Sequence, residues 1–118
     1  MTAPREVAEA FSRHRFRDVY AVLAPDVVWT AVGARQTVGR QAVVDACEQT
    51  LAALASTDVV FTRFLPVADG DAAAVDAVAH YTDPGGGTSV VSSCDVYEIR
   101  AGVLVAITSY DVELETAG

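Results

Sequence analysis

Carboxylates and a histidine stand in the middle of strongly apolar segments in the second half of the chain. Asp76 and His80 belong to the segment 72–82, and Asp95 belongs to the segment 88–100. Aspartate is disfavoured in β-strands and costly to bury unpaired, whereas a carboxylate beside an imidazole suits general acid–base catalysis. Asp76 is about 13 Å from His80 along an extended strand, which is too far for a direct hydrogen bond. We therefore expect Asp95, on a neighbouring strand, to be the partner of His80. We therefore predict that His80 moves a proton and that Asp95 orients it or donates a hydrogen bond to an oxyanion.

Side chains alternate between the two faces of a strand, which sorts the polar residues by position. The segments 72–82, 88–100 and 103–114 each carry a mixed face with an acid in mid-strand. If the mixed faces share one side of a sheet, they bring together Asp76, His80, Ser93, Asp95, Ser109 and Asp111. The alternative is a water-exposed face on which these side chains are solvated.

The aromatic residues Tyr20, Trp29 and Tyr97 are candidates for the wall of a binding pocket. The alternative is that each belongs to the hydrophobic core. The full set of candidate ligand-binding residues is Tyr20, Trp29, Asp76, Ser93, Tyr97, Ser109 and Asp111. His14 falls on the apolar face of the first predicted helix, where we expect a core or helix-end histidine rather than a ligand. No cysteine or histidine cluster has metal-ligand spacing, so we expect neither a metal nor another cofactor.

Helical periodicity is confined to the first half of the chain, and β-formers dominate the second half. Two short helices with a bend near His14 are predicted: the first has Pro4 in its first turn and an apolar face over 7–14, and the second spans 16–23. A third helix is predicted over 40–55. A strand is predicted over 27–32, with a short return at 37–38. Four long strands joined by short turns then predict an antiparallel meander over 59–67, 72–82, 88–100 and 103–114. Helices followed by a sheet indicate an α+β domain.

The composition supports one globular domain over 1–118. With 118 residues, 52% hydrophobic and 20% charged, the chain can bury a core and is not a disordered protein. No apolar run approaches the roughly 20 residues that a membrane helix needs. The net charge of −8 argues against a nucleic-acid partner. We expect a cytoplasmic bacterial protein, because all eight basic residues are arginine and Cys47 and Cys94 suit reduced thiols.

Four motifs, taken in order, resemble the nuclear transport factor 2-like superfamily in its SnoaL-like branch. They are LAPDVVW at 23–29, VGRQAV at 38–43, SCDVYEI at 93–99 and ITSYD at 107–111. The resemblance implies a cystatin-like α+β cone, in which a curved mixed or antiparallel sheet wraps around the N-terminal helices. It also implies a pocket on the concave side and a homodimer through the convex sheet face. The resemblance places the even positions of 72–82 and the odd positions of the last two strands on the concave side.

Enzymes with this fold offer catalytic sets that the chain matches only in part. Compared with ketosteroid isomerases, Asp95 matches the acid that binds the substrate oxyanion. The isomerase's base falls on Ala31, and its helical tyrosine falls near Val7. Compared with limonene epoxide hydrolases, the two aspartates of the water-activating triad fall on Val78 and Ser109. Neither reaction is therefore expected. Scytalone dehydratases use histidines and tyrosines in a similar pocket, although no position-by-position match was found.

Two classes of function stay open at this point. The first is a SnoaL-like enzyme without a cofactor, acting by isomerisation, cyclisation or dehydration on a small, hydrophobic, oxygenated metabolite. The second is a non-catalytic ligand-binding protein or a dimeric scaffold, because this fold hosts both. A weaker third interpretation is a subunit that binds another protein through its sheet.

Overall fold

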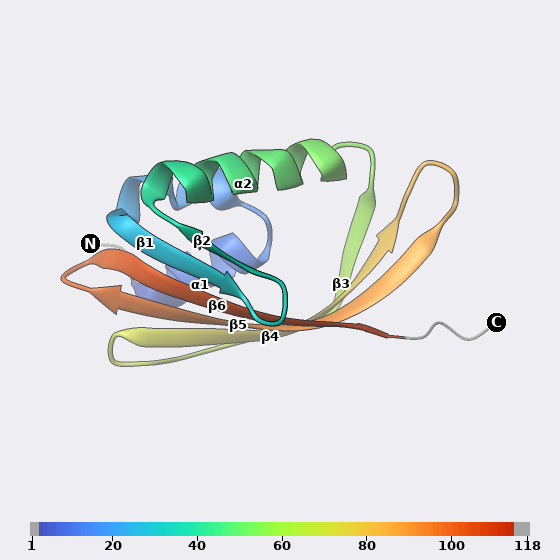
Figure 1. Ribbon diagram of the computed structural model, residues 1–118. Helices are drawn as coiled ribbons and strands as arrows, with labels where there is room; N and C mark the ends of the chain where they lie inside the picture. The colour runs from blue at the N-terminus through green and yellow to red at the C-terminus, as the bar shows by residue number, and fades with distance from the viewer. Residues whose placement is uncertain (1–2, 115–118) are drawn as a thin grey trace.

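The computed structural model describes residues 3–114, and its elements run from helices near the N-terminus to a long strand meander (Figure 1). The helical elements are α1 (Pro4–Ser12), the 3-10 turns η1 (Phe16–Asp18) and η2 (Tyr20–Val22), and α2 (Arg40–Leu54). The strands are β1 (Leu23–Ala31), β2 (Arg35–Val38), β3 (Asp58–Asp69), β4 (Ala72–Thr82), β5 (Thr88–Arg100) and β6 (Val103–Leu114).

All six strands form one sheet in the order β2-β1-β6-β5-β4-β3. The meander from β3 to β6 is antiparallel, as predicted, whereas β1 pairs with β6 in parallel and so makes the sheet mixed. The sheet curves beneath α1 and α2, which both lie on its concave side (Figure 1). This architecture confirms the predicted α+β fold with a curved sheet around helices.

The predicted helix over 16–23 is wrong, because the chain makes two short 3-10 turns there and then enters β1. Phe16 and Val19 are buried, and Val22 packs against the core. A spacing of three residues matches the 3.0 residues per turn of a 3-10 helix better than the 3.6 of an α-helix. The burial of these side chains therefore decides the local geometry.

The hydrophobic core lies between the concave face of the sheet and the two helices. Its fully buried larger side chains come from every layer: Val19, Val27, Val43, Cys47, Val75, Tyr97, Leu104 and Ile107. Burial raises the pKa of the Cys47 thiol to about 12, so this cysteine is a protonated core residue at neutral pH. Cys94 lies half-buried, and neither cysteine forms a disulfide.

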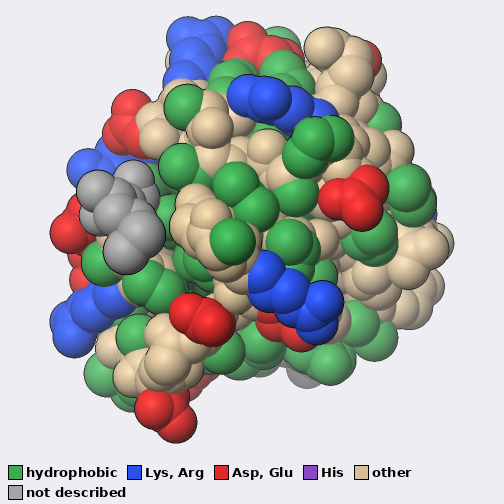
Figure 2. Space-filling view, turned by 90° about the vertical axis from the view of Figure 1, so that its left-hand side faces the viewer, with side chains coloured by type: hydrophobic (Ala, Val, Ile, Leu, Met, Phe, Trp, Pro, Cys, Tyr) green, Lys and Arg blue, Asp and Glu red, His purple; other side chains and the backbone are tan. Residues whose placement is uncertain are grey.

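The outer surface carries charges of both signs, scattered between apolar side chains. Figure 2 shows this for the end of the molecule that holds the β3–β4 and β5–β6 turns, where the described arginines are spread apart rather than gathered into a patch. Among residues 3–114, no helix is long and apolar enough to cross a membrane.

Candidate functional site

The concave floor of the sheet is built from transverse rows of paired residues. The first row joins Tyr97, Ile107, Trp29 and Thr37; the second joins Asp95, Ser109, Ala31 and Arg35; the third joins Ser93 and Asp111. Tyr97 and Ile107 are fully buried, Ser109 is 6% exposed, and Asp111 is exposed. The floor therefore changes from a closed apolar end to an open polar end within three rows.

A cavity of about 300 Å³ lies above the polar rows, between the sheet, the end of α1 and the second half of α2. Its lining is aromatic and polar: Phe11, Ser12, His14, Phe16, Trp29, Thr50, Leu54, Phe61, Tyr81, Val91, Ser93, Asp95, Ser109 and Asp111. A concavity with aromatic walls and converging polar groups is typical of a small-molecule site.

His14 enters this cavity because of the way α1 ends. The backbone N–H of Arg15 donates to the carbonyl of Ala10 at 2.8 Å, and that of His14 donates to the carbonyl of Phe11 at 3.0 Å. This pair of bonds is a Schellman motif, and it places His14 at the position where glycine is usual, with φ of 65°. A non-glycine residue held in this left-handed conformation often marks a functional site.

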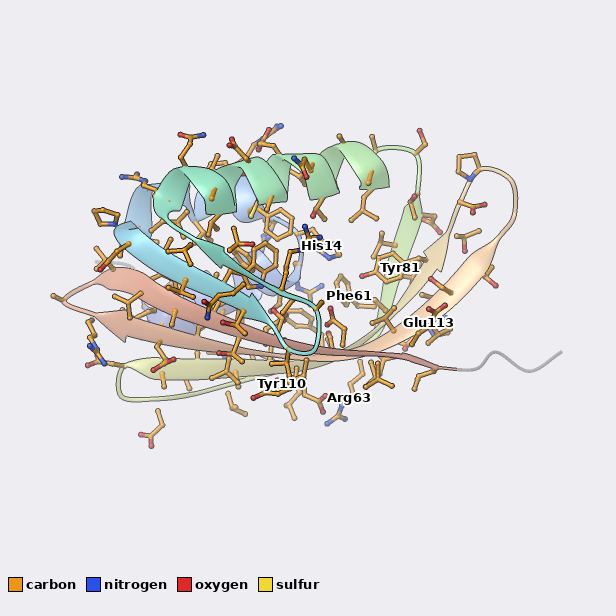
Figure 3. All side chains as sticks on the ribbon, in the orientation of Figure 1. His14, Phe61, Arg63, Tyr81, Tyr110 and Glu113 are labelled. Atoms are coloured by element: carbon orange, nitrogen blue, oxygen red, sulfur yellow. The ribbon has the colours of Figure 1, made fainter. Side chains whose placement is uncertain are left out.

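Aromatic rings surround the His14 imidazole. Its ring centroid lies 5.6 Å from that of Phe16, 5.9 Å from that of Phe61 and 6.2 Å from that of Tyr81. Figure 3 shows His14, Phe61 and Tyr81 together in the space between α2 and the sheet. Burial lowers the pKa of His14 below its ordinary value near 6.5, although the charge of Asp95 acts in the opposite direction. The imidazole is therefore neutral at pH 7 and able to accept a proton.

Asp95 is held by a short chain of hydroxyl groups. Ser12 Oγ donates to Asp95 Oδ2 at 2.9 Å, and Ser12 Oγ and Tyr97 OH lie 2.6 Å apart. Since Ser12 has one proton, the Tyr97 hydroxyl donates to Ser12 when Ser12 donates to Asp95. Burial raises the pKa of Tyr97 well above its ordinary value, and the charge of Asp95 adds to this effect. Tyr97 therefore supports the carboxylate from beneath and does not line the cavity.

Two other titratable groups in the cavity hold their protons more tightly than usual. The pKa of Asp111 is raised by burial and then by the charge of Asp95. The pKa of Tyr81 is raised by burial and by the charges of Asp111 and Asp95. The site thus combines a base whose pKa is lowered, His14, with acidic groups whose pKa values are raised. Titratable groups whose pKa values are shifted in opposite directions are typical of acid–base sites.

Trp29 forms part of the cavity wall, and a single polar bond fixes its orientation. Its indole Nε1–H donates to Ser109 Oγ at 3.0 Å, and its ring packs edge-on against Phe11 with centroids 5.1 Å apart. The structure thus brings Trp29, Ser93, Asp95, Ser109 and the missed His14 to one cavity.

The predicted convergence of His80 and Asp76 with Asp95 is wrong, because β4 presents the opposite face. Thr82 pairs with Thr88 across a five-residue loop, so paired residues of β4 and β5 have the same parity. Asp95 therefore lies opposite Val75 on the concave side, whereas the even positions of β4 point to the convex side. His80 is exposed there, and Asp76 accepts a hydrogen bond from Arg63 Nε at 2.9 Å.

Tyr20 is also outside the cavity. Its hydroxyl donates to Glu48 Oε2 at 2.7 Å, and this bond ties η2 to α2. Its predicted place in the pocket wall is taken by residues from β3 and β4, Phe61 and Tyr81.

A β-bulge in β3 places Phe61 and Phe64 on the same side of the sheet. The register between β3 and β4 shifts between Phe61 and Arg63, so that Phe61 and Phe64 both face the concave side while Arg63 faces outward. Arg13 then lies over the two rings, with its guanidinium carbon 3.8 Å from the Phe64 centroid and 5.5 Å from that of Phe61. Alternation alone does not reveal a bulge, so this wall could not be predicted from the spacing of the residues.

Sequence comparison assigns the chain to a family. The pattern of the SnoaL-like domain matches residues 5–107, which is most of the chain. The chain belongs to the SnoaL-like domain family. No curated protein matches the chain significantly.

Solved structures of the nuclear transport factor 2-like type share the fold of this SnoaL-like protein. An NTF2-like protein of unknown function from Cytophaga hutchinsonii is 24% identical, with a TM-score of 0.78 over 90% of this chain and 93% of that one. A putative polyketide cyclase from Xanthomonas campestris is 24% identical, with a TM-score of 0.67 over 88% and 83%. An epoxide hydrolase of M. tuberculosis, described as LEH-like, is 20% identical, with a TM-score of 0.63 over 89% and 76%. These likenesses confirm the predicted superfamily and its SnoaL-like branch.

The strand register also bears on Val78, the residue that matched one aspartate of the water-activating triad of epoxide hydrolases. Val78 points outward, and the concave neighbours at this level of β4 are Ala77 and Ala79. Neither alanine can activate water. Among residues 3–114 no group of three or more histidine, cysteine or acidic side chains is placed to hold a metal ion.

Proposed function

We propose that this SnoaL-like protein is an enzyme that moves protons on a small, oxygenated, largely apolar molecule without a cofactor. The observation that carries the proposal is the position of His14, a neutral imidazole in the same cavity as the carboxyl groups of Asp95 and Asp111. His14 takes the role of base that the sequence assigned to His80. Asp95 is the carboxylate whose negative charge favours the protonated form of this base.

The proposed reaction starts with removal of a proton from a carbon next to a carbonyl group. His14 accepts this proton, and the electron pair of the C–H bond moves toward the carbonyl oxygen to form an enolate. The Asp95 carboxylate stabilises the imidazolium, because its negative charge raises the pKa of His14. The hydroxyl of Tyr81 is available as a donor to the enolate oxygen, since its raised pKa keeps it protonated.

Return of the proton from the imidazolium to a different carbon completes an isomerisation. If the enolate carbon instead attacks a second carbonyl carbon, a C–C bond forms, and the imidazolium protonates the resulting alkoxide to complete a cyclisation. If the enolate expels a hydroxyl group from the neighbouring carbon, the imidazolium protonates that group, and water leaves to complete a dehydration. The aromatic walls contributed by Phe11, Phe16 and Phe61 favour an apolar ring in the substrate.

The shared first step can be tested without the natural substrate. We would incubate the protein with 2-tetralone in D₂O and follow loss of the α-hydrogen signals by NMR. We expect exchange above the buffer rate for the wild type, and a drop of roughly 10²-fold or more for His14→Asn, the range in which general bases contribute. Asparagine is chosen because it tolerates the left-handed backbone at this position. The exchange rate should rise with pH and then level off, with the midpoint of the rise below pH 6.5, because burial lowers the pKa of His14 from that value.

His80→Gln is the matched control, since it removes the other histidine from the outer face. Exchange that survives His14→Asn, or that is lost equally in both variants, would exclude His14 as the base. A protein that binds 2-tetralone without accelerating exchange would instead be the non-catalytic ligand-binding protein that the sequence left open.

We further propose that two copies of the chain pair through the convex face of the sheet. Large apolar side chains on this face are about half exposed: Val60, Leu65, Val67, Tyr110, Val112 and Leu114. Figure 3 shows Tyr110 on the side of the sheet away from the helices. Water-exposed apolar side chains from separate strands of one face are typical of a self-associating surface.

A further inference from the structure

We propose that the cavity is one half of a longer groove, and that Arg35 at the far end of this groove binds the carboxylate of an elongated substrate. The inference rests on the proposed function, since it names the class of molecule that the same site takes.

A second hollow of about 350 Å³ adjoins the cavity beneath α2. Trp29, Thr50 and Asp111 line both hollows, so the two share a wall rather than lying on separate faces. The space exists because the helix presents small side chains here, with Ala46, Thr50 and Ala53 following one another at helical spacing. One ligand can therefore occupy both hollows while it packs against the Trp29 ring.

The register of the sheet fixes the length of that ligand. Asp95 pairs with Ser109, Ser109 pairs with Ala31, and Ala31 pairs with Arg35, all in one transverse row. Three strand spacings of about 4.8 Å place Asp95 and Arg35 about 14 Å apart along the sheet, and less in a straight line because the sheet curves. The arginine side chain covers part of this span, which leaves a length typical of a molecule with two fused rings.

Arg35 has the chemistry of a carboxylate receptor. It is the one cationic side chain that lines either hollow in the described chain, and it forms no ion pair with another residue among 3–114. Its guanidinium offers a planar fork of donors that matches a carboxylate. Gln49 and Thr37 add neutral donors beside it. One cation with neutral donors suits a monoanion better than a phosphate, particularly in a chain of net charge −8.

The two ends of the groove therefore select different groups. The aromatic end, with His14 and Asp95, binds the reactive ring of the substrate. The other end, with Arg35, binds the substrate's carboxylate and so positions the ring. Asp111 lies between the ends, because it lines both hollows.

The test uses 6-hydroxy-2-naphthoate, a rigid two-ring acid with a hydroxyl group at its other end, and the neutral 6-hydroxy-2-naphthamide. Binding is followed by NMR through the indole N–H signal of Trp29, the single tryptophan, which lies in the shared wall. We expect the acid to bind about tenfold more tightly than the amide to the wild type, as for a charged hydrogen-bonded pair. Arg35→Gln should abolish this preference without weakening amide binding, whereas Arg100→Gln, outside both hollows, should preserve it.

Equal affinities for the two probes, or a preference that survives Arg35→Gln, would overturn the assignment of Arg35. Failure of both probes to move the Trp29 signal would overturn it too. The exchange assay with 2-tetralone decides the proposed function separately, because it needs neither a carboxylate nor Arg35.

Discussion

Among single residues, Ser12 links the hydrophobic core to the cavity through two hydrogen bonds. It is 8% exposed and connects Tyr97 on the core side to Asp95 on the cavity side. A buried hydroxyl that loses its partner incurs a desolvation penalty, while removal of both partners avoids it.

We expect Ser12→Ala to lower the free energy of unfolding by about 1–3 kcal/mol, because it leaves the Tyr97 hydroxyl buried without its partner. Tyr97→Phe should cost about 1 kcal/mol, and the double variant should cost less than the sum of the two. Urea unfolding of the four proteins measures this coupling. Strictly additive effects would show that the Ser12–Tyr97 bond contributes nothing to stability.

At the scale of elements, the position of α2 over the sheet depends on a polar clamp to the 3-10 turns. Arg17 of η1 donates twice to Glu48 of α2, at 2.8 and 3.1 Å, and Tyr20 of η2 donates to the same carboxylate. These hydrogen bonds, first that from Arg17 and then that from Tyr20, lower the pKa of Glu48 to about 2. Since α2 roofs both hollows, the clamp also maintains the groove.

We expect Glu48→Gln to lower the melting temperature at pH 7 but to have little effect near pH 2. The folded pKa lies below the unfolded value near 4.5, so the stabilisation is complete above pH 4.5 and is lost as the pH falls toward 2. The effect is modest, because the pair is exposed to solvent. Thermal unfolding at the two pH values measures it, with the exposed Glu6→Gln as control. A difference that does not change with pH would rule out the carboxylate as its source.

In the whole molecule, the two faces of the sheet differ in burial. The concave face forms the core and the groove, and the convex face leaves apolar side chains in water. Val112 is 60% exposed and Val67 is 53% exposed, which are high values for valines on regular strands.

If the convex face is the dimer interface, Val67→Asp and Val112→Asp should each convert a dimer into a monomer, because a buried unpaired charge is costly. Sedimentation velocity over a range of concentrations measures the change in mass. Ala52→Asp, exposed on α2, is the control and should remain dimeric. A wild-type protein that stays monomeric at all concentrations would exclude this interface.

Most of the helices and strands could be predicted from the amino-acid sequence. Alternation and turn residues predicted the bounds of β4, β5 and β6 correctly, and helical spacing predicted α1 and α2. These signals are local, because the hydrophobic periodicity of a strand or helix depends only on the residues within it. The polar positions Ser93, Asp95, Ser109 and Asp111 were also recognisable, because polar residues interrupt apolar strands there.

Only the tertiary structure decided which histidine faces the cavity. The choice depends on the pairing of Thr82 with Thr88, since a change of one residue in register moves every side chain of β4 to the other face. It depends equally on the left-handed turn at His14, which ends α1 and directs the imidazole inward. Neither feature repeats along the chain, so hydrophobic periodicity cannot predict either the register or the turn. The groove that ends at Arg35 depends on the pairing of β1 with β6, which are distant in the sequence and join two hairpins into one row.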